Sequence, residues 1–280
     1  MKLVRNLTVE QPITAIELLA KVLPELSKSR LKDAMAKGAV LLNTKPKKRL
    51  RRAQTALLPG QKLEIHYDDD LLQRQCDKAV LLHDMQGYSV WFKPAGMLSQ
   101  GNEWGDHLAL LRAVELHFGH KRPVFLLHRL DREASGLVLL AHSKKMAAAF
   151  SKMIANHAID KEYLVAVKGE LSRELQQTAK IVSSLDGKAC ETQFYNVHYA
   201  ADLNQSKLQV KLISGRKHQI RRHFAAIQHP VIGDPMYGDN NKDSKGLALQ
   251  AVGLSFNCPQ TQQRQNISLP AHLQHISVSF

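Results

Sequence analysis

The chain has 280 residues, of which 39 are Lys or Arg and 25 are Asp or Glu, so its formal net charge is +14. Such a surplus favours a polyanionic partner, either nucleic acid or an anionic membrane surface. No apolar run reaches the roughly 18 to 20 residues of a membrane-spanning helix, and the first residues lack the apolar centre of a secretory signal. Three cysteines without CxxC spacing argue against a disulfide framework and a zinc knuckle, so we expect a cytoplasmic protein.

The first 67 residues contain a short succession of helices and strands. Apolar side chains on one face predict a helix over residues 16–23, and a second helix follows and ends at Gly38. Strands are predicted over residues 40–42 and 62–67. This order indicates a small α/β domain over residues 1–67.

Six basic residues occupy the eight positions from 45 to 52, between these two strands. A charge run alone is usually a solvated face. However, "KSRLKDAMAKGAVLLN" and the closing "PGQKLEI" resemble the S4-like RNA-binding domain first recognised in a ribosomal small-subunit protein, although Thr44 stands where that family usually has Gly. The resemblance implies that RNA is contacted by Lys28, Arg30, Lys47, Lys48, Arg49, Arg51 and Arg52.

After an acidic, polar stretch that we expect to be a linker, residues 68–78, strands alternate with single helices. A hairpin that turns near Gly87 comes first. Further strands are predicted over residues 137–141, 162–168, 192–199 and 207–213, and helices over residues 106–118, 144–157 and 216–228. The order predicts an α+β domain over residues 79–280, with a mainly antiparallel mixed sheet flanked by helices and loops.

The stretch "HRLDREASGLVLLA" sets charged and imidazole side chains in front of an apolar strand, where a solvated turn would be the ordinary explanation. It closely resembles the motif of the RluA family of RNA pseudouridine synthases. The family's other motifs are similar to "FKPAGML", "DKEYLVAVKG" and "LISGRKHQIRRHFAAIQHPVIGDPMYG", which occur in the same order. The resemblance implies an isomerase that detaches uracil from its ribose within RNA, rotates it and rejoins it through carbon five, without a cofactor.

The resemblance also implies roles for individual residues. Asp131 is the expected catalytic carboxylate, acting as a nucleophile or as a base. Tyr163 matches the aromatic residue that stacks on the uracil. Arg221 is matched to the basic partner of Asp131, with Arg216 as a rival, since a nearby cation favours an ionised carboxylate.

Duplex or stacked RNA hides its bases, so the uridine must be flipped out before any group reaches its glycosidic bond. By resemblance, Arg129 inserts where the base was, and its planar guanidinium suits stacking there. His128, beside it, and Arg216 are expected to contact the RNA as well. A simple phosphate or carboxylate partner for Arg129 is the alternative.

Two other classes of function compete with this one. The first is a non-catalytic RNA-binding or ribosome-assembly protein on the same scaffold. The second is a small-molecule hydrolase, which the positive charge and the lack of a GxSxG motif disfavour. Three histidines near one another, His218, His223 and His229, lack the spacing of known metal sites, so no metal is expected. We expect a monomer acting on large-subunit ribosomal RNA, with transfer RNA as the alternative.

Overall fold

The computed structural model describes residues 1–213, 215–238, 241, 243 and 246–276. The chain forms two compact units, and both are discontinuous in sequence. The first unit comprises Met1–Cys76 and Leu98–His120, and the second comprises Asp77–Met97 and Lys121–Phe280. No described helix is long and apolar enough to cross a membrane.

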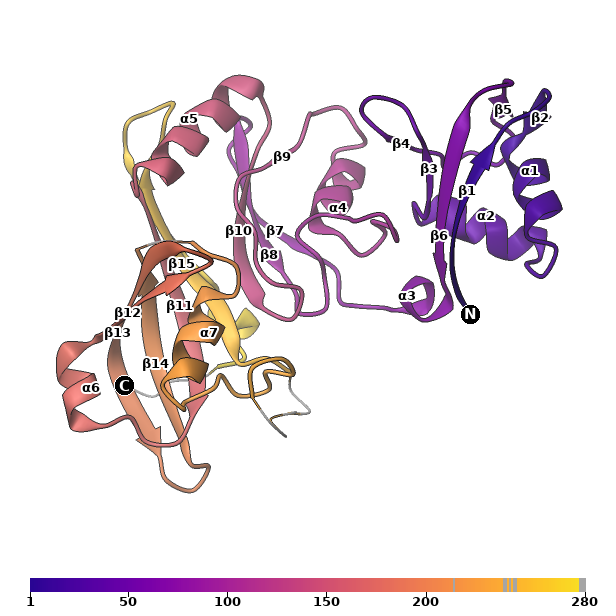
Figure 1. Cartoon of the computed structure of the whole chain (residues 1–280). Coiled ribbons are helices and arrows are strands. Elements are labelled where there is room, and N and C mark those ends of the chain that lie inside the picture. Colours follow the sequence, from indigo (N-terminus) through magenta and orange to yellow (C-terminus); the bar gives the residue numbers. More distant parts are fainter. Residues whose placement is uncertain (214, 239–240, 242, 244–245, 277–280) are drawn as a thin grey trace. The chain divides into compact units, whose positions relative to one another are not determined.

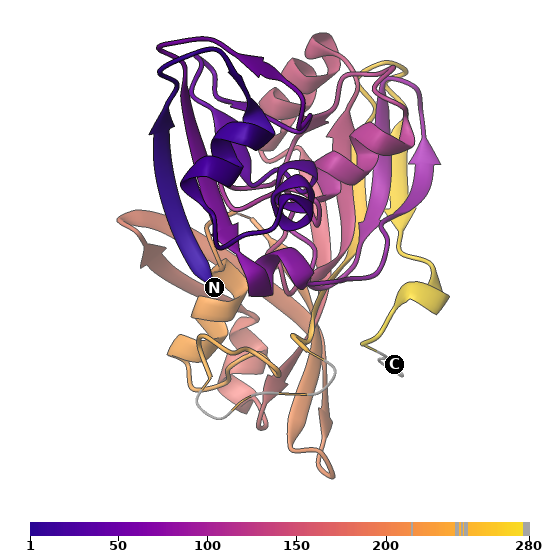
Figure 2. The same ribbon diagram turned by 90° about the vertical axis from the view of Figure 1, so that its right-hand side faces the viewer.

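The first unit is a small sheet covered by helices. Its sheet has the order β1-β6-β3-β4, and a separate pair joins β2 to β5. The strands are β1 (Lys2–Thr8), β2 (Ile13–Thr14), β3 (Val40–Leu42), β4 (Lys48–Arg49), β5 (Ala56–Leu57) and β6 (Lys62–Asp68). The helices are α1 (Ala15–Val22), α2 (Lys28–Ala36), α3 (Asp69–Gln73) and α4 (Leu110–His117). Figure 2 shows α1 and α2 together on one face of this sheet.

Local capping explains where the first two helices begin and end. Thr14 and Glu17 form a capping box at the start of α1, and the Ser27 hydroxyl accepts the Arg30 amide at the start of α2. Gly38 follows α2 with a φ of +83°, a left-handed conformation that glycine adopts without a steric penalty.

The expected linker is partly structured. Asp68 ends β6, and its carboxylate accepts the Leu71 amide at 3.1 Å, so it starts helix α3. Leu72 is buried in the core of the first unit. The segment therefore belongs to this unit as far as Cys76. The acidic residues suggested a free linker, but the apolar Leu72 side chain packs into the core.

The second unit is built on one large sheet with the order β12-β13-β14-β11-β15-β10-β8-β7, to which β9 and β16 add at β10 and β15. Its strands are β7 (Val80–Asp84), β8 (Tyr88–Lys93), β9 (Phe125–Leu126), β10 (Ser135–Ala141), β11 (Ile159–Lys168), β12 (Lys180–Leu185), β13 (Lys188–Ala200), β14 (Gln205–Leu212), β15 (Leu249–Asn257) and β16 (Arg264–Ser268). The β10–β15 pair is parallel and the other pairs are antiparallel, which confirms the predicted α+β fold with a mainly antiparallel mixed sheet.

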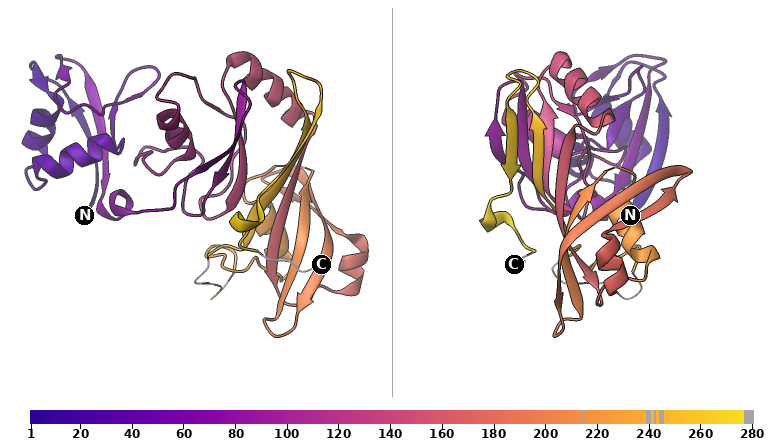
Figure 3. Two further views of the ribbon diagram at one scale, coloured as in Figure 1. Left: turned by 180° about the vertical axis from the view of Figure 1, so that it is seen from behind. Right: turned by 90° about the vertical axis from the view of Figure 1, so that its left-hand side faces the viewer.

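Two helices contact this sheet in separate places. Helix α5 (Lys144–Ala155) contacts β10, and α7 (Gln219–Ala226) contacts β12 and β13 (Figure 1). The short α6 (Arg173–Thr178) precedes β12, and Ala271–Leu273 forms one 3₁₀ turn. Figure 3 shows the separate positions of α5 and α7 in two further views.

One glycine sets the contact between β10 and β15. Gly136 has a φ of +119°, and a Cβ there would lie 2.1 Å from the carbonyl oxygen of Ala251. No other residue allows this approach of the two parallel strands. The strand that follows the charged loop is therefore fixed at the centre of the sheet.

Candidate active site

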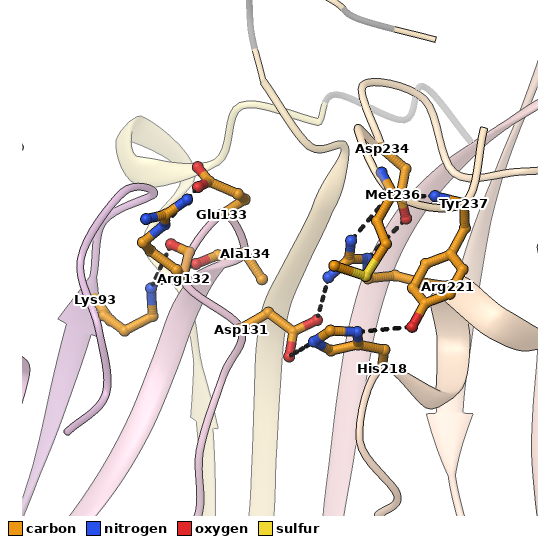
Figure 4. A network of polar contacts seen from close by, with 10 residues as sticks. All are labelled: Lys93, Asp131, Arg132, Glu133, Ala134, His218, Arg221, Asp234, Met236 and Tyr237. Atoms are coloured by element: carbon orange, nitrogen blue, oxygen red, sulfur yellow. Dashed lines mark hydrogen bonds and ion pairs between the residues drawn. The ribbon is translucent and has the colours of Figure 1, made fainter. Parts of the chain in front are cut away.

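The loop that carries Asp131 connects β9 to β10, and a buried lysine holds its backbone. The Lys93 ammonium is fully buried at the end of β8. It donates to the carbonyl oxygens of Pro94 and Met97, at 2.9 and 2.8 Å. It also donates to those of Arg132 and Ala134, at 3.3 and 2.7 Å (Figure 4). Sequence reasoning did not single out Lys93, although it lies inside the quoted "FKPAGML" motif. A buried cation needs such acceptors, and four of them here are loop carbonyls.

Arg221, on α7, pairs with Asp131. Its Nη1 donates to Asp131 Oδ2 at 3.0 Å. The Arg221 side chain is only 5% exposed, whereas that of Asp131 is 25% exposed. Arg216 is exposed, and its side chain forms no ion pair in the described part of the chain. Of the two rival arginines, the one that meets the carboxylate is Arg221.

A second carboxylate, Asp234, orients Arg221. Its two oxygens accept from Arg221 Nε at 2.7 Å and Nη2 at 2.8 Å, and Asp234 is fully buried. Backbone amides of Met236 and Tyr237 donate to the same carboxylate. Burial would raise the pKa of Asp234, but the bonds from Arg221 and the two amides outweigh it and lower the pKa. Sequence reasoning missed Asp234; the "GDPMYG" turn was the available signal.

His218 approaches the other oxygen of Asp131. Its Nε2 lies 3.7 Å from Asp131 Oδ1, and its Nδ1 lies 2.9 Å from the Tyr237 hydroxyl (Figure 4). Burial lowers the pKa of His218 in spite of the charge on Asp131, so the imidazole is neutral at neutral pH. The Tyr237 ring lies 5.1 Å from the Arg221 guanidinium. Asp131 is thus balanced by one cation and bordered by a neutral ring.

Tyr163 is buried on β11, where β15 has an irregular register opposite it. Burial raises the pKa of its phenol, and the negative charge of Asp131 raises it further. The hydroxyl therefore stays protonated over the whole physiological range. The electrostatic effect of Asp131 on Tyr163 indicates that the loop and β11 contribute to one site.

The two residues before Asp131 have different environments. Arg129 is exposed, and its side chain makes no hydrogen bond or ion pair with the described residues. The Nε2 of His128 accepts the Leu139 amide of β10 at 3.1 Å. Burial, helped by the charge on Lys161, lowers the pKa of His128 to about 3. His128 is therefore a neutral acceptor for the backbone, while Arg129 is free to meet a ligand.

The basic cluster of the first unit divides into paired and unpaired residues. Arg49 and Arg51 both bind Oδ2 of Asp106, and Lys47 binds Glu64 at 2.8 Å. Arg30 lies 4.0 Å from Asp69. Lys28, Lys48 and Arg52 are exposed and form no ion pair in the described part of the chain. Among the described residues, no group of His, Cys, Asp and Glu side chains could hold a metal ion.

Comparison with known proteins gives a consistent result. A family model described as RNA pseudouridylate synthase matches residues 87–226. The ribosomal large subunit pseudouridine synthase C of Haemophilus ducreyi is 28% identical over 281 residues, covering 90% of this chain and 86% of the relative. The tRNA pseudouridine synthase C of the same organism is 31% identical over 205 residues, covering 63% and 84%. An uncharacterized RNA pseudouridine synthase of Mycoplasma pneumoniae is 26% identical over 268 residues, covering 86% and 84%.

Two solved structures share the fold. Human RNA Pseudouridylate Synthase Domain Containing 4 has a TM-score of 0.53 and 22% identity, covering 69% of this chain and 89% of that one. Human RNA Pseudouridylate Synthase Domain Containing 1 has a TM-score of 0.55 and 19% identity, covering 72% and 88%. At this level of identity the likeness concerns the fold.

Proposed function

The chain belongs to the RNA pseudouridylate synthase family, whose members are isomerases, and we propose that it converts uridine to pseudouridine with Asp131 as the catalytic carboxylate. The observation that carries the proposal is the contact of Asp131 with Arg221 and, through it, with Asp234. This arrangement holds the Asp131 carboxylate in one orientation, while a quarter of its side chain stays open to a ligand.

The reaction breaks the bond between C1′ of the ribose and N1 of uracil, and it forms a bond between C1′ and C5. The proton on C5 is lost, and N1 gains one, so the product is an isomer of the substrate. An ionised carboxylate beside the ribose serves this exchange by bonding to the sugar or by removing a sugar proton. Both routes use a carboxylate oxygen of Asp131, and Arg221 holds that carboxylate in place through the bond at 3.0 Å.

Two further residues complete the proposed site. Tyr163 stacks on the flipped uracil, and its phenol stays protonated because burial and Asp131 raise its pKa. Arg129 occupies the gap that the base leaves in the RNA, since its exposed guanidinium has no competing partner among the described residues.

We also propose that residues 1–67 are an S4-like RNA-binding domain and that the target is large-subunit ribosomal RNA, modified in the cytoplasm by a monomer. The ribosomal relative supports this target because a match over 90% of the chain must include part of the first 76 residues. The tRNA synthase from the same organism matches only 63% of the chain. Transfer RNA is the second candidate.

The test is tritium release from RNA labelled at C5 of uracil, with RNA from cells that lack this protein. We expect release by the wild type from the large-subunit ribosomal fraction and none by Asp131→Asn. The variant must still unfold cooperatively in urea, since the substitution keeps the shape of the side chain but removes the charge that pairs with Arg221. Turnover by a folded Asp131→Asn protein would contradict the assignment, and release from the transfer RNA fraction alone would change the target.

A further inference from the structure

Lys161 lies on β11 on the same face as Tyr163. Side chains alternate along a strand, so residues two apart project to the same side. The neighbours of Lys161 in sequence, Asp160 and Glu162, project to the other side and have partners there. Asp160 binds Lys211 and Arg264, both at 2.8 Å, and Glu162 accepts from Tyr195 at 3.1 Å. The Lys161 ammonium is therefore separated from both nearby carboxylates.

This lysine has no partner of its own in the described part of the chain. It is half-buried, and it forms no hydrogen bond or ion pair with the described residues. Burial lowers its pKa, and no carboxylate counteracts that effect. Its charge acts on His128, which is neutral and already accepts the Leu139 amide. The fully buried Lys93 differs, because four carbonyl oxygens surround it.

We propose that Lys161 binds a backbone phosphate of the RNA beside the flipped uridine. A partly buried ammonium without a counterion destabilises the free protein, and such groups are found where a ligand supplies the missing charge. The ligand of this site is a polyanion, and its phosphates adjoin the nucleoside that Asp131 and Tyr163 contact. The inference rests on the proposed function, and it assigns the phosphate to a residue on the same strand face as Tyr163.

The proposal predicts opposite effects of one substitution on folding and on binding. Lys161→Met keeps the length of the side chain and removes the charge. We expect its urea midpoint to rise, because an uncompensated charge is replaced by an apolar group. We expect RNA affinity to fall, and the slope of log affinity against log salt to decrease by about 0.7 to 0.9, the value for one lost phosphate contact.

Binding is measured with full-length protein carrying Asp131→Asn and a transcript of unmodified large-subunit ribosomal RNA. Lys161→Arg should keep the salt slope. Lys168→Met, at the exposed end of the same strand, is the matched control and should leave the slope unchanged. An unchanged slope in Lys161→Met, an equal loss in Lys168→Met, or a lower urea midpoint in Lys161→Met would each overturn the proposal. This assay measures binding alone. The proposed isomerisation is tested separately by tritium release from the wild-type protein, so the two proposals can fail independently.

Discussion

Each unit contains a cluster of aspartate and arginine that is at least partly buried, but the two clusters have opposite composition. In the first unit, Arg49 and Arg51 share Asp106, so two guanidiniums meet one carboxylate and the formal charge is +1. In the second, Asp131 and Asp234 share Arg221, so two carboxylates meet one guanidinium and the formal charge is −1. The same kind of ion pair therefore leaves one excess positive charge in the first unit and one excess negative charge in the second.

The difference has a chemical meaning at the proposed active site. Cleavage of a glycosidic bond gives the sugar positive character, which a net negative cluster stabilises. Asp234 accepts from two of the three guanidinium nitrogens of Arg221, and only the third nitrogen donates to Asp131. The cluster around Asp106 offers no exposed carboxylate oxygen to a ligand. Both arginines bind one oxygen, and the other oxygen is buried without a partner among the described residues.

The largest effect is expected from Asp234→Asn, which removes the buried counterion of Arg221. Loss of one member of a buried pair costs about 3 to 5 kcal/mol of unfolding free energy. Tritium release should also fall, since Arg221 loses its orientation. Urea unfolding and the release assay measure both.

The matched control for Asp234→Asn is Asp186→Asn, which breaks the exposed pair with Arg222 on the same helix and should have little effect. Acid provides a second check. Because the pKa of Asp234 is lowered on folding, its contribution is present above its ordinary pKa of about 3.9 and is lost as the pH falls through the lowered value. The urea midpoint of the wild type should fall in this acid range more steeply than that of Asp234→Asn; equal slopes would contradict the assigned pair.

A smaller effect is expected from Asp106→Asn, because its partners are more exposed than Arg221. Removing the carboxylate leaves Arg49 and Arg51 to repel each other, which should cost about 1 to 3 kcal/mol. The loss should appear in unfolding, while tritium release at low temperature is retained. Glu103→Gln, in the same loop but exposed, is the control. Equal stability of the two variants would show that the Asp106 cluster has no structural role.

The smallest effect concerns the exposed cations of the first unit. Replacing Lys48 and Arg52 with Ser should weaken RNA binding and reduce the salt slope by roughly 1.4 to 1.8, the sum for two phosphate contacts. Lys47→Ser should change the slope less, because Lys47 binds Glu64. Filter binding over a series of salt concentrations measures the slope for the double variant and for Lys47→Ser. If Lys47→Ser has the larger effect, RNA displaces the Glu64 pair and the division into paired and unpaired cations is wrong.

Sequence patterns predicted the elements whose signals are local. The apolar run after the charged loop is β10, and the "RKHQIRRHFAAIQ" stretch contains α7. The ion pair between Arg221 and Asp131 joins residues that are 90 positions apart. The family motifs alone left two candidates for the partner of Asp131, Arg221 and Arg216. Strand β1 was missed because only two of its seven residues are buried, which leaves a weak alternating pattern.

Other features depend on contacts that a linear pattern does not contain. Arg49 and Arg51 have the composition of an exposed basic run, but their partner Asp106 lies 55 residues beyond Arg51. The predicted helix over residues 106–118 begins only at Leu110, because the backbone before it pairs with Leu98. The Leu98 amide donates to the Leu108 carbonyl, and the Leu110 amide donates to the Leu98 carbonyl. Lys93 and Asp234 lie inside the family motifs, yet their roles follow from the carbonyls and the guanidinium that the fold brings to them.

The discontinuity of the first unit has a consequence for synthesis on the ribosome. Domains commonly fold as they emerge, starting from the N-terminus. Here the Asp106 that pairs with Arg49 and Arg51 is translated only after the whole β7–β8 hairpin of the other unit. During synthesis, Arg49 and Arg51 therefore lack their carboxylate partner until Asp106 has left the exit tunnel. The first unit is complete only when residues up to His120 have emerged, so the two units cannot fold strictly one after the other.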